Sequence, residues 1–426
     1  MDTKSSLVNL ETIGKRAKQA ARLTSRLTTD VKNKALINIA NSLEENVNQV
    51  LEANSLDYEA AALNKLNESV LDRLKITYER LSSIAKDVRT ISALDDPIGQ
   101  TDELKLLPNG VKVGKRTVPL GVIATIYESR PNVTIDISSL CLKSGNAVIL
   151  RGGSEAFNTN STLVSLIRDS IEQAGAPRDS VQFIKSTDKA LVGQLLEMKD
   201  YIDLIIPRGG SELVHRVVSE AKMPAITGGI GVCHIYVDTY ADVDMAVLIA
   251  NNAKVSRPYV CNALDTLLVH SNIAPKFLPK IAAKWKDSGV EIRGDKRTLT
   301  IIGRENPDAI VDAKTSDWGT EFLSLTASIK IVDSIDEALE HIYEYSSGHT
   351  EAIISEDYHN AMHFLDEVDA GVVLVNASTR FNDGGQLGLG AEVGISTSKM
   401  HARGPMGLKE LTSYKWTAFG SGQIRE

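Results

Sequence analysis

Cys261 is the residue of this chain best placed for covalent chemistry. Residues 240–255 before it carry apolar side chains at helical spacing, and residues 264–269 after it form a short apolar run that predicts a buried strand. Pro258 ends the helix, because proline lacks an N–H group and biases Arg257 away from helical angles. The sequence therefore predicts Cys261 on a rigid turn between two buried elements, where a nucleophile is fixed, accessible and close to backbone N–H groups.

A nucleophilic Cys261 also requires a lowered thiol pKa, because an ordinary thiol with a pKa of about 8.5 is only a few per cent thiolate at pH 7. Arg257 is one source of positive charge in the same segment. The competing interpretation is a buried structural cysteine, which is the commoner role of this residue type.

The other two cysteines are better explained as structural. Cys141 lies on the apolar side of a predicted helix, and Cys233 lies in a predicted strand beside His234. Adjacent side chains of a strand point to opposite faces, and no third ligand is spaced nearby, so Cys233 and His234 make a poor metal site. We therefore predict no metal centre.

The composition excludes several classes of protein. The chain has 426 residues, of which 42% are hydrophobic and 24% are charged, and this predicts two or three globular domains. A formal net charge of −8 argues against a nucleic-acid partner. Three widely spaced cysteines favour a reducing compartment. No run approaches the ~20 apolar residues of a membrane span, and no signal core opens the chain. We expect a soluble cytoplasmic protein.

The pattern along the chain changes at about residue 104. Residues 8–95 predict packed amphipathic helices, and residues 104–120 predict a strand–turn–strand ribbon with Asn-Gly at its turn. From Gly121 onward, short apolar runs alternate with helical segments, which predicts parallel sheets covered by helices on both faces. The polar, glycine-rich stretch 376–407 is expected to be a functional loop.

Two glycine-rich turns follow predicted strands and precede predicted helices. Backbone amides and a helix N-terminus at such a place can hold phosphate. Neither turn matches G-x-G-x-x-G, so a plain tight turn remains the alternative. The candidate cofactor-binding residues of these turns are Arg151, Gly152, Gly153 and Ser154 in the first and Arg208, Gly209 and Gly210 in the second.

Several motifs together resemble the gamma-glutamyl phosphate reductase family, also called glutamate-5-semialdehyde dehydrogenases, of the aldehyde dehydrogenase superfamily. The resemblance runs from the first helices to Trp416 without a large gap. The motifs are Glu128-Ser-Arg-Pro-Asn-Val-Thr134, Pro207-Arg-Gly-Gly210, Arg257-Pro-x-x-Cys261-Asn-Ala, Asn376-Ala-Ser-Thr-Arg-Phe and the C-terminal stretch from Gly388 to Leu408.

The resemblance implies an α/β, aldehyde dehydrogenase-like fold, with two parallel-sheet α/β domains and a small β oligomerisation element. The NADP-binding domain would comprise residues 1–103 and 121–229, and the catalytic domain residues 230–398. Residues 104–120 and 399–426 would form the oligomerisation or bridging element. The family also implies a monofunctional homo-oligomer, with the glutamate 5-kinase that supplies its substrate as a possible partner.

The reaction implied by the resemblance is the reduction of L-glutamyl 5-phosphate by NADPH to the 5-semialdehyde, with release of phosphate, in proline biosynthesis. Cys261 would form a thioester with the substrate. Its backbone N–H would hold the oxyanion, with Asn132 or Arg130 as the second donor. Glu321 would hold the nicotinamide ribose. Candidate cations for the substrate's phosphate and carboxylate are Arg130, Arg257 and Arg380, and which arginine binds which anion stays open.

Two sequence differences refine this expectation. Aldehyde dehydrogenases that use NAD commonly carry Lys-x-x-Glu where this chain has Arg151-Gly-Gly-Ser154, so we predict NADP, although a shift of one position would bring in Glu155. Residues 225–232, where hydrolytic relatives carry a general base, contain no carboxylate. The alternatives are a hydrolytic NAD(P)-dependent aldehyde dehydrogenase and a non-catalytic module of the same fold.

Overall fold

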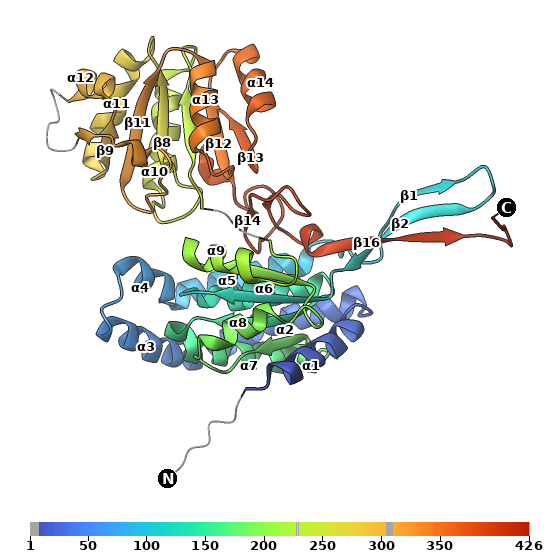
Figure 1. Cartoon of the computed structure of the whole chain (residues 1–426). Coiled ribbons are helices and arrows are strands. Elements are labelled where there is room, and N and C mark those ends of the chain that lie inside the picture. The colour runs from blue at the N-terminus through green and yellow to red at the C-terminus, as the bar shows by residue number, and fades with distance from the viewer. Residues whose placement is uncertain (1–7, 227, 229, 304–309, 426) are drawn as a thin grey trace. The chain divides into compact units, whose positions relative to one another are not determined.

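The computed structural model describes residues 8–226, 228, 230–303 and 310–425 (Figure 1). The chain divides into two compact units. Unit 1 consists of Met1–Gly228, Gly388–Gly394 and Met406–Glu426, and unit 2 of Gly229–Leu387 and Ile395–Pro405. No helix of the described residues has both the length and the apolar character needed to cross a membrane.

Unit 1 begins with amphipathic helices, as the sequence predicts. Most of them start at a polar residue whose side chain accepts a hydrogen bond from the first turn, among them Asn9, Thr28 and Thr77. Such caps satisfy N–H groups that have no partner inside the helix. The helices are α1 (Leu10–Thr24), α2 (Thr29–Glu45), α3 (Val47–Leu63), α4 (Glu68–Leu74) and α5 (Tyr78–Ala93).

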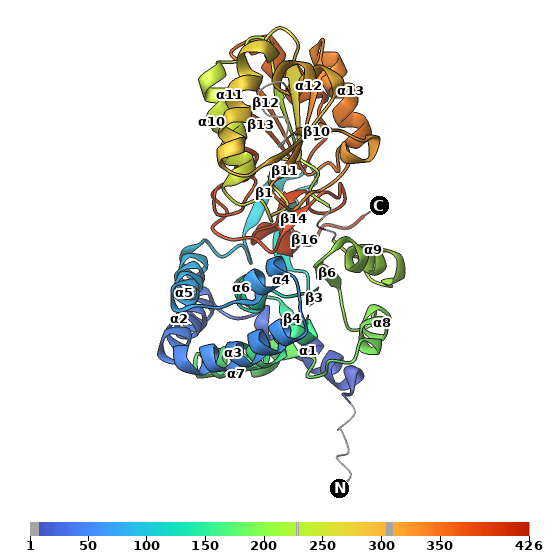
Figure 2. The same ribbon diagram turned by 90° about the vertical axis from the view of Figure 1, so that its left-hand side faces the viewer.

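A four-stranded parallel sheet forms the centre of unit 1, with strand order β5-β4-β3-β6. Helices α1, α8 and α9 share a hydrophobic core with one face of it. Helices α6 and α7 cover the other face and are packed against α2 and α5 (Figure 2). The elements are β3 (Val122–Tyr127), α6 (Pro131–Lys143), β4 (Ala147–Gly152), α7 (Phe157–Gln173), β5 (Val181–Phe183), α8 (Ala190–Leu196), β6 (Leu204–Arg208) and α9 (Ser211–Glu220).

A three-stranded antiparallel sheet extends unit 1 in the order β1-β2-β16, from β1 (Thr101–Leu106), β2 (Lys112–Pro119) and β16 (Thr412–Phe419). The predicted Asn-Gly turn joins β1 to β2, and its Gly110 has a φ of +84°, which glycine adopts without a steric penalty. Strand β1 is exposed along its whole length, and β16 exposes Tyr414, Trp416 and Phe419. Long exposed strands with aromatic side chains are typical of surfaces that another chain covers.

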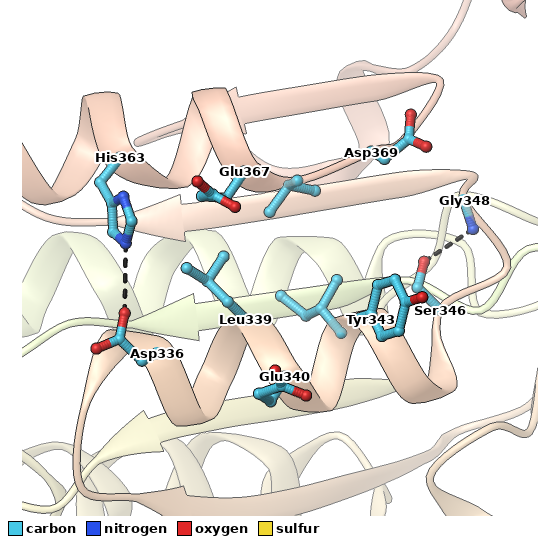
Figure 3. Close-up of a pocket in the computed structure, with 11 residues that line it drawn as sticks. Asp336, Leu339, Glu340, Tyr343, Ser346, Gly348, His363, Glu367 and Asp369 are labelled. Carbon is cyan, nitrogen blue, oxygen red and sulfur yellow. Dashed lines mark hydrogen bonds and ion pairs between the residues drawn. The ribbon is translucent and has the colours of Figure 1, made fainter.

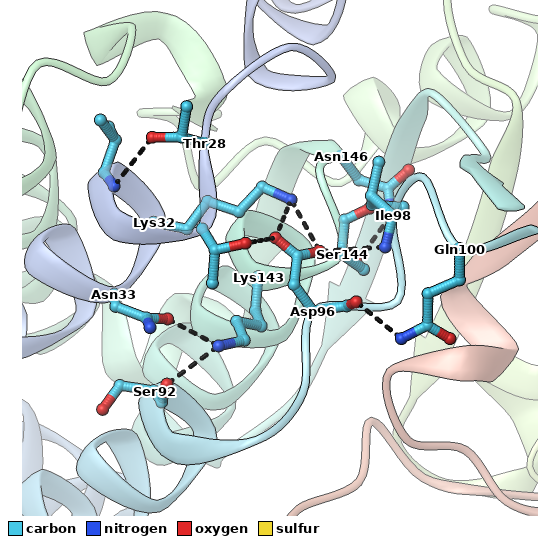
Figure 4. A network of polar contacts seen from close by, with 12 residues as sticks. Thr28, Lys32, Asn33, Ser92, Asp96, Ile98, Gln100, Lys143, Ser144 and Asn146 are labelled. Carbon is cyan, nitrogen blue, oxygen red and sulfur yellow. Dashed lines mark hydrogen bonds and ion pairs between the residues drawn. The ribbon is translucent and has the colours of Figure 1, made fainter.

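Two buried lysines hold α2, α5 and α6 to the segment that leads into β1 (Figure 4). The Lys32 Nζ atom lies 2.8 Å and 3.0 Å from the two carboxylate oxygens of Asp96. The Lys143 Nζ atom donates to Asn33 Oδ1 at 2.6 Å and to the Ser92 carbonyl at 2.9 Å. Burial lowers the pKa of Lys143, so these acceptors are needed to compensate for lost hydration.

Unit 2 is a seven-stranded parallel sheet in the order β10-β9-β11-β8-β7-β12-β13. Helices α10, α11 and α12 pack on one face around the fully buried Trp285, and α13 and α14 pack on the other (Figure 2). The elements are β7 (His234–Val237), α10 (Val243–Val255), β8 (Thr266–His270), α11 (Ala274–Asp287), β9 (Glu291–Gly294), α12 (Lys296–Ile302), β10 (Ile310–Asp312), β11 (Thr326–Val332), α13 (Ile335–Tyr345), β12 (Thr350–Ile354), α14 (Tyr358–Glu367) and β13 (Val372–Val375).

The predicted fold class is confirmed, since both units are parallel α/β layers and a small antiparallel sheet accompanies them. The sequence did not predict β9, α12 or β10. Strands β9 and β10 are short, and charged residues such as Glu291, Arg293 and Asp312 interrupt their apolar pattern. Strands of three or four residues give little periodicity to detect.

Candidate active site

Cys261 lies in the turn between α10 and β8 and is half-buried, whereas Cys141 and Cys233 are buried. The turn follows the end of α10 at Val255 and contains Pro258, as the sequence predicts. The strands of the seven-stranded sheet in unit 2 are parallel, so residues that precede these strands gather at one edge of the sheet. Cys261 is therefore at the amino edge of the sheet in unit 2.

The backbone of residues 231–233 lies directly against Cys261. The Cys233 Sγ atom donates to the Cys261 carbonyl at 3.1 Å. A Cβ atom added to Gly231 would overlap that carbonyl oxygen and would lie 2.8 Å from the Cβ of Cys261. Only glycine permits this approach, so Gly231 and Cys233 together hold the main chain of the candidate nucleophile.

The loop that contains Arg380 surrounds the residue after the nucleophile. The Asn262 Nδ2 atom donates to the Asn382 carbonyl at 2.9 Å, and the Thr379 hydroxyl donates to the Asn262 carbonyl at 2.7 Å. The Arg380 guanidinium donates to the side-chain oxygen of Asn262. These bonds place the Arg380 side chain beside the Cys261 turn.

Arg257 and Cys261 both interact electrostatically with Arg380. Burial lowers the pKa of Arg380, and the neighbouring positive charge of Arg257 lowers it further. Two guanidinium groups that repel each other favour an anion between or beside them. Unit 2 therefore brings together a thiol and two cations, which suits the attack of a thiolate on a substrate that carries an anion.

Glu321, the fourth predicted site residue of unit 2, also lies at the amino edge of the sheet, ahead of β11. The N–H of the next residue, Phe322, donates to Asp265 at 3.0 Å. Asp265 follows the Cys261 turn and precedes β8. The Glu321 and Cys261 segments are thus connected through one carboxylate.

Both glycine-rich turns lie in unit 1, at the carboxyl edge of its sheet, where ligands of open α/β sheets commonly bind. In the first turn, the Arg151 guanidinium donates to the Gly152 carbonyl and, at 3.4 Å and 3.3 Å, to the carbonyls of Thr187 and Asp188. Burial lowers the pKa of Arg151. Ser154 is exposed beside this turn.

Glu155 closes the first turn from the other side. One of its carboxylate oxygens accepts from the Ser129 N–H at 2.6 Å and from the Ser129 hydroxyl at 2.8 Å. Ser129 has a φ of +43°, which is strained for a residue other than glycine. A Cβ atom on Gly153 would overlap the Glu155 carboxylate, so this glycine permits the contact.

The helix N-termini behind the two turns differ in what they offer a ligand. The first N–H groups of α7 already donate to the buried Asp57 carboxylate, from Asn158 at 3.2 Å and from Thr159 at 2.7 Å. At α9, the N–H of exposed Gly210 donates to Glu128 at 3.0 Å. A carboxylate on an exposed helix N-terminus shows that this position accepts an anion, so the second turn fits a cofactor phosphate better.

Asn132 and Arg130 lie at the start of α6 in unit 1. The Asn132 Nδ2 atom donates to Asp136 Oδ2 at 2.9 Å, which leaves its second N–H for another acceptor. Burial raises the pKa of Asp136 to about 7, and the positive charge of Arg208 acts against this rise. The predicted site residues are thus divided between the units, with Cys261, Arg257, Arg380 and Glu321 in unit 2 and the others in unit 1.

A cavity of about 560 Å³ between α13 and α14 is lined by none of the predicted site residues (Figure 3). Acidic side chains such as Glu340 and Glu367 surround it, and the His363–Asp336 and Ser346–Gly348 contacts cross its ends. Among the described residues, no group of three histidine, cysteine or acidic side chains is arranged to hold a metal ion.

Sequence reasoning missed the residues that support the nucleophile from elsewhere in the chain. Thr379, Asn382 and Gly231 contact the Cys261 turn, and Asp265 links it to Phe322, the residue after Glu321. The partners in each of these contacts are 30 or more residues apart along the chain, so local periodicity contains no signal for them. The glycine between Ile230 and Val232 was the one available hint, because it follows a stretch rich in glycine.

The chain is similar to known proteins over nearly its whole length. The sequence profile of the aldehyde dehydrogenase family matches residues 4–303. A gamma-glutamyl phosphate reductase from Dehalococcoides mccartyi is 55% identical over 420 residues, which cover 99% of each chain. The crystal structure of gamma-glutamyl phosphate reductase from Thermotoga maritima has a TM-score of 0.93 at 45% identity and covers 98% of this chain and 100% of that one. An acetylating aldehyde dehydrogenase from Geobacillus thermoglucosidasius shares the fold, with a TM-score of 0.73 at 19% identity.

The paired α/β units and the profile match define an enzyme of the aldehyde dehydrogenase superfamily. Within this superfamily, the 55% identity over nearly the whole chain to a gamma-glutamyl phosphate reductase identifies the family. The chain belongs to the gamma-glutamyl phosphate reductase family, and the resemblance found in the sequence motifs is confirmed.

Proposed function

We propose that this enzyme reduces L-glutamyl 5-phosphate to L-glutamate 5-semialdehyde with NADPH and releases phosphate, as a step of proline biosynthesis. The observation that carries the proposal is the grouping of Cys261, Arg257 and Arg380 in unit 2. The substrate carries a phosphate and a carboxylate, and guanidinium groups bind both kinds of anion. In this proposal the Cys261 thiol attacks the acyl carbon of the substrate.

The chemistry follows from an already activated substrate. The Cys261 thiolate attacks the acyl carbon, the bond from that carbon to the phosphate oxygen breaks, and a thioester forms without the help of a strong acid. The N–H of Cys261 and a second donor, Asn132 or Arg130, hold the oxyanion. A nicotinamide cofactor, when bound, supplies the hydride that reduces the thioester. The Cys261 thiolate then leaves and the aldehyde is released.

A nicotinamide cofactor is implied by membership of the family, and the preference for NADP over NAD is part of the proposal. The position where a ribose-binding glutamate would stand holds exposed Ser154, which does not repel a 2′-phosphate. The Glu155 carboxylate accepts two hydrogen bonds from Ser129 and would have to break them to bind a ribose. Arg151 would have to leave the backbone carbonyls that it now contacts to pair with the phosphate.

Glu321 is proposed to hold the nicotinamide ribose, and Gly209 and Gly210 the cofactor phosphates. For these phosphates to bind, the Glu128 carboxylate must leave the Gly210 N–H. We further propose that the exposed β1-β2-β16 sheet forms contacts in a homo-oligomer. A glutamate 5-kinase as partner and the cytoplasm as location complete the proposal, since both follow from the pathway.

The decisive experiment is the reverse reaction, with semialdehyde and NADP as substrates. Turnover should depend on phosphate, because phosphate is the nucleophile that releases the acyl group from Cys261. Cys261→Ser should abolish turnover, whereas Cys141→Ser, in the core of unit 1, and Cys233→Ser should retain most of it. Steady formation of free glutamate without phosphate would support the hydrolytic alternative. A folded wild-type enzyme that leaves NADPH fluorescence unchanged would support a non-catalytic module.

A further inference from the structure

A buried ion pair lies at the amino edge of the sheet in unit 2. Lys254 is 0% exposed and Asp265 is 2% exposed, and the Lys254 Nζ atom lies 3.8 Å from Asp265 Oδ1. The same ammonium donates to the Leu264 carbonyl at 2.8 Å. Burial lowers the pKa of Lys254 and raises that of Asp265 to about 7, because each charge has lost its hydration. Buried pairs of this kind add little net stability.

The two carboxylate oxygens of Asp265 bind two different segments. Asp265 Oδ1 accepts from the Phe322 N–H at 3.0 Å, and Asp265 Oδ2 accepts from the Cys233 N–H at 3.3 Å. The Asp265 main chain also donates to the Cys233 carbonyl at 3.0 Å. An apolar pair of the same volume could fill this space, but it could not accept two N–H groups at once.

The two segments that Asp265 binds are next to the two residues with proposed roles, Glu321 and Cys261. Phe322 follows Glu321, and Leu323 after it has a φ of +47°, a conformation that persists only where the surroundings impose it. The Phe322 ring lies 5.9 Å from Lys254 Nζ. On the other side, the Cys233 thiol donates to the Cys261 carbonyl at 3.1 Å. One carboxylate therefore lies between the Glu321 segment and the Cys261 turn.

We propose that Asp265, held in place by Lys254, is a positioning residue that sets the Glu321 segment and the Cys261 turn relative to each other. Asp265 acts in this proposal through the Phe322 and Cys233 N–H groups that it accepts from, and not by contact with substrate or cofactor. The inference rests on the proposed roles of Glu321 and Cys261. The inference adds to these roles that Asp265 couples two proposed sites. One is the site of the nicotinamide ribose, and the other is the site where the thioester forms.

The chain contains a matched control at the opposite edge of the same sheet. Asp238 is 1% exposed, and its carboxylate accepts from the Ser355 hydroxyl at 2.7 Å, from Asn360 Nδ2 at 2.9 Å and from the Tyr236 hydroxyl at 3.1 Å. It follows β7, whereas Asp265 precedes β8. Asp238→Asn and Asp265→Asn thus remove similar buried carboxylates at opposite ends of one layer.

The test compares these two variants and Lys254→Met in the full-length enzyme. An amide at Asp265 keeps one acceptor but presents an N–H₂ group to the second backbone N–H. We expect Asp265→Asn to raise the Kd for NADPH, measured by fluorescence, about tenfold or more and to slow the alkylation of Cys261 by iodoacetamide by a similar factor. Lys254→Met, which leaves the carboxylate in place, should shift both quantities in the same direction. Asp238→Asn should lower the Tm and leave both quantities within about twofold of wild type.

The proposal is overturned if Asp265→Asn and Asp238→Asn lower the Tm alike while neither changes alkylation or cofactor binding. If Asp265→Asn does not fold, the Lys254→Met variant decides. Wild-type alkylation and wild-type NADPH binding in Lys254→Met would overturn the proposal. Alkylation and NADPH fluorescence require no substrate. Suppose that the wild-type enzyme does not reduce glutamyl phosphate, but Asp265→Asn still changes both the alkylation of Cys261 and the binding of NADPH. The proposed function would then be wrong, and the role of Asp265 would stand.

Discussion

Gly231→Ala offers the sharpest test of how the main chain positions the nucleophile. The added Cβ would overlap the Cys261 carbonyl oxygen and would lie 2.8 Å from the Cys261 Cβ, against 3.4–4 Å for an ordinary contact. The carbonyl oxygen belongs to the main chain and the Cβ is bonded directly to it, so neither atom is the far end of a flexible side chain that could move aside. The Cys261 Cβ must therefore move away by at least about 0.6 Å to reach an ordinary contact distance. The overlapped carbonyl oxygen must move further, so the Cys261 turn as a whole must shift by roughly 1 Å.

A misplacement of roughly 1 Å at the reacting atom costs on the order of a hundredfold in rate. We therefore expect kcat of the phosphate-dependent reverse reaction to fall by about that factor in Gly231→Ala. NADPH binding, followed by fluorescence, should change far less, because both glycine-rich turns proposed to hold the cofactor are in unit 1. The Cys233 thiol would also lose its alignment with the Cys261 carbonyl.

Gly193→Ala is the matched control. Gly193 lies within α8, and a Cβ there would meet only the end of the Arg216 side chain at 3.5 Å. Alanine is the better helix former, so this change should leave kcat unaltered and raise stability by up to about 1 kcal/mol. A Gly231→Ala enzyme with wild-type kcat and wild-type alkylation of Cys261 would show that the close approach at Gly231 does not position the thiol.

Three further outcomes are expected. The enzyme should prefer NADPH to NADH by about tenfold in kcat/KM, which corresponds to ~1.4 kcal/mol, and equal values for the two cofactors would contradict the assignment of Ser154 and Arg151. Oxidation of the semialdehyde in phosphate-free buffer should stall and should resume when phosphate or arsenate is added. The reason is that residues 225–232 contain no carboxylate that could activate water as a general base. Thr227 and Gly229 of that stretch lie outside the described residues. Burial lowers the pKa of His341 to about 3 from its usual 6.5, so its neutral form stabilises the fold above pH 6.5, and this contribution is lost as the pH falls toward 3. Urea unfolding between pH 7 and pH 4 should show His341→Gln losing less stability than wild type, by up to about 1.4 kcal/mol per pH unit, and parallel curves would refute the buried neutral imidazole.

The sequence predicted the central elements of both sheets because buried parallel strands are continuous apolar runs between turn residues. Ala147–Gly152 and Thr350–Ile354 are of this kind. Short strands such as Glu291–Gly294 were missed, because their side chains are partly solvated and form no apolar run.

The candidate site shows the same division. The position of Cys261 on a turn follows from Pro258 and the flanking apolar runs, all within twenty residues, and local steric rules suffice to predict it. The hydrogen bond from Arg380 to Asn262 joins residues 118 positions apart, and the link from Asp265 to Phe322 spans 57 positions. Nothing in the local chain chemistry encodes such pairs.

The sequence by itself determined the fold class, the candidate nucleophile and, through its motifs, the family. The tertiary structure alone decided which groups surround the thiol, that Gly231 presses against its carbonyl, and that a buried carboxylate couples it to the Glu321 segment. The reason is physical. Periodicity and turn chemistry act between near neighbours along the chain, whereas the order of parallel strands, set by long crossovers and by packing of the whole layer, determines which strand ends meet at one edge of the sheet.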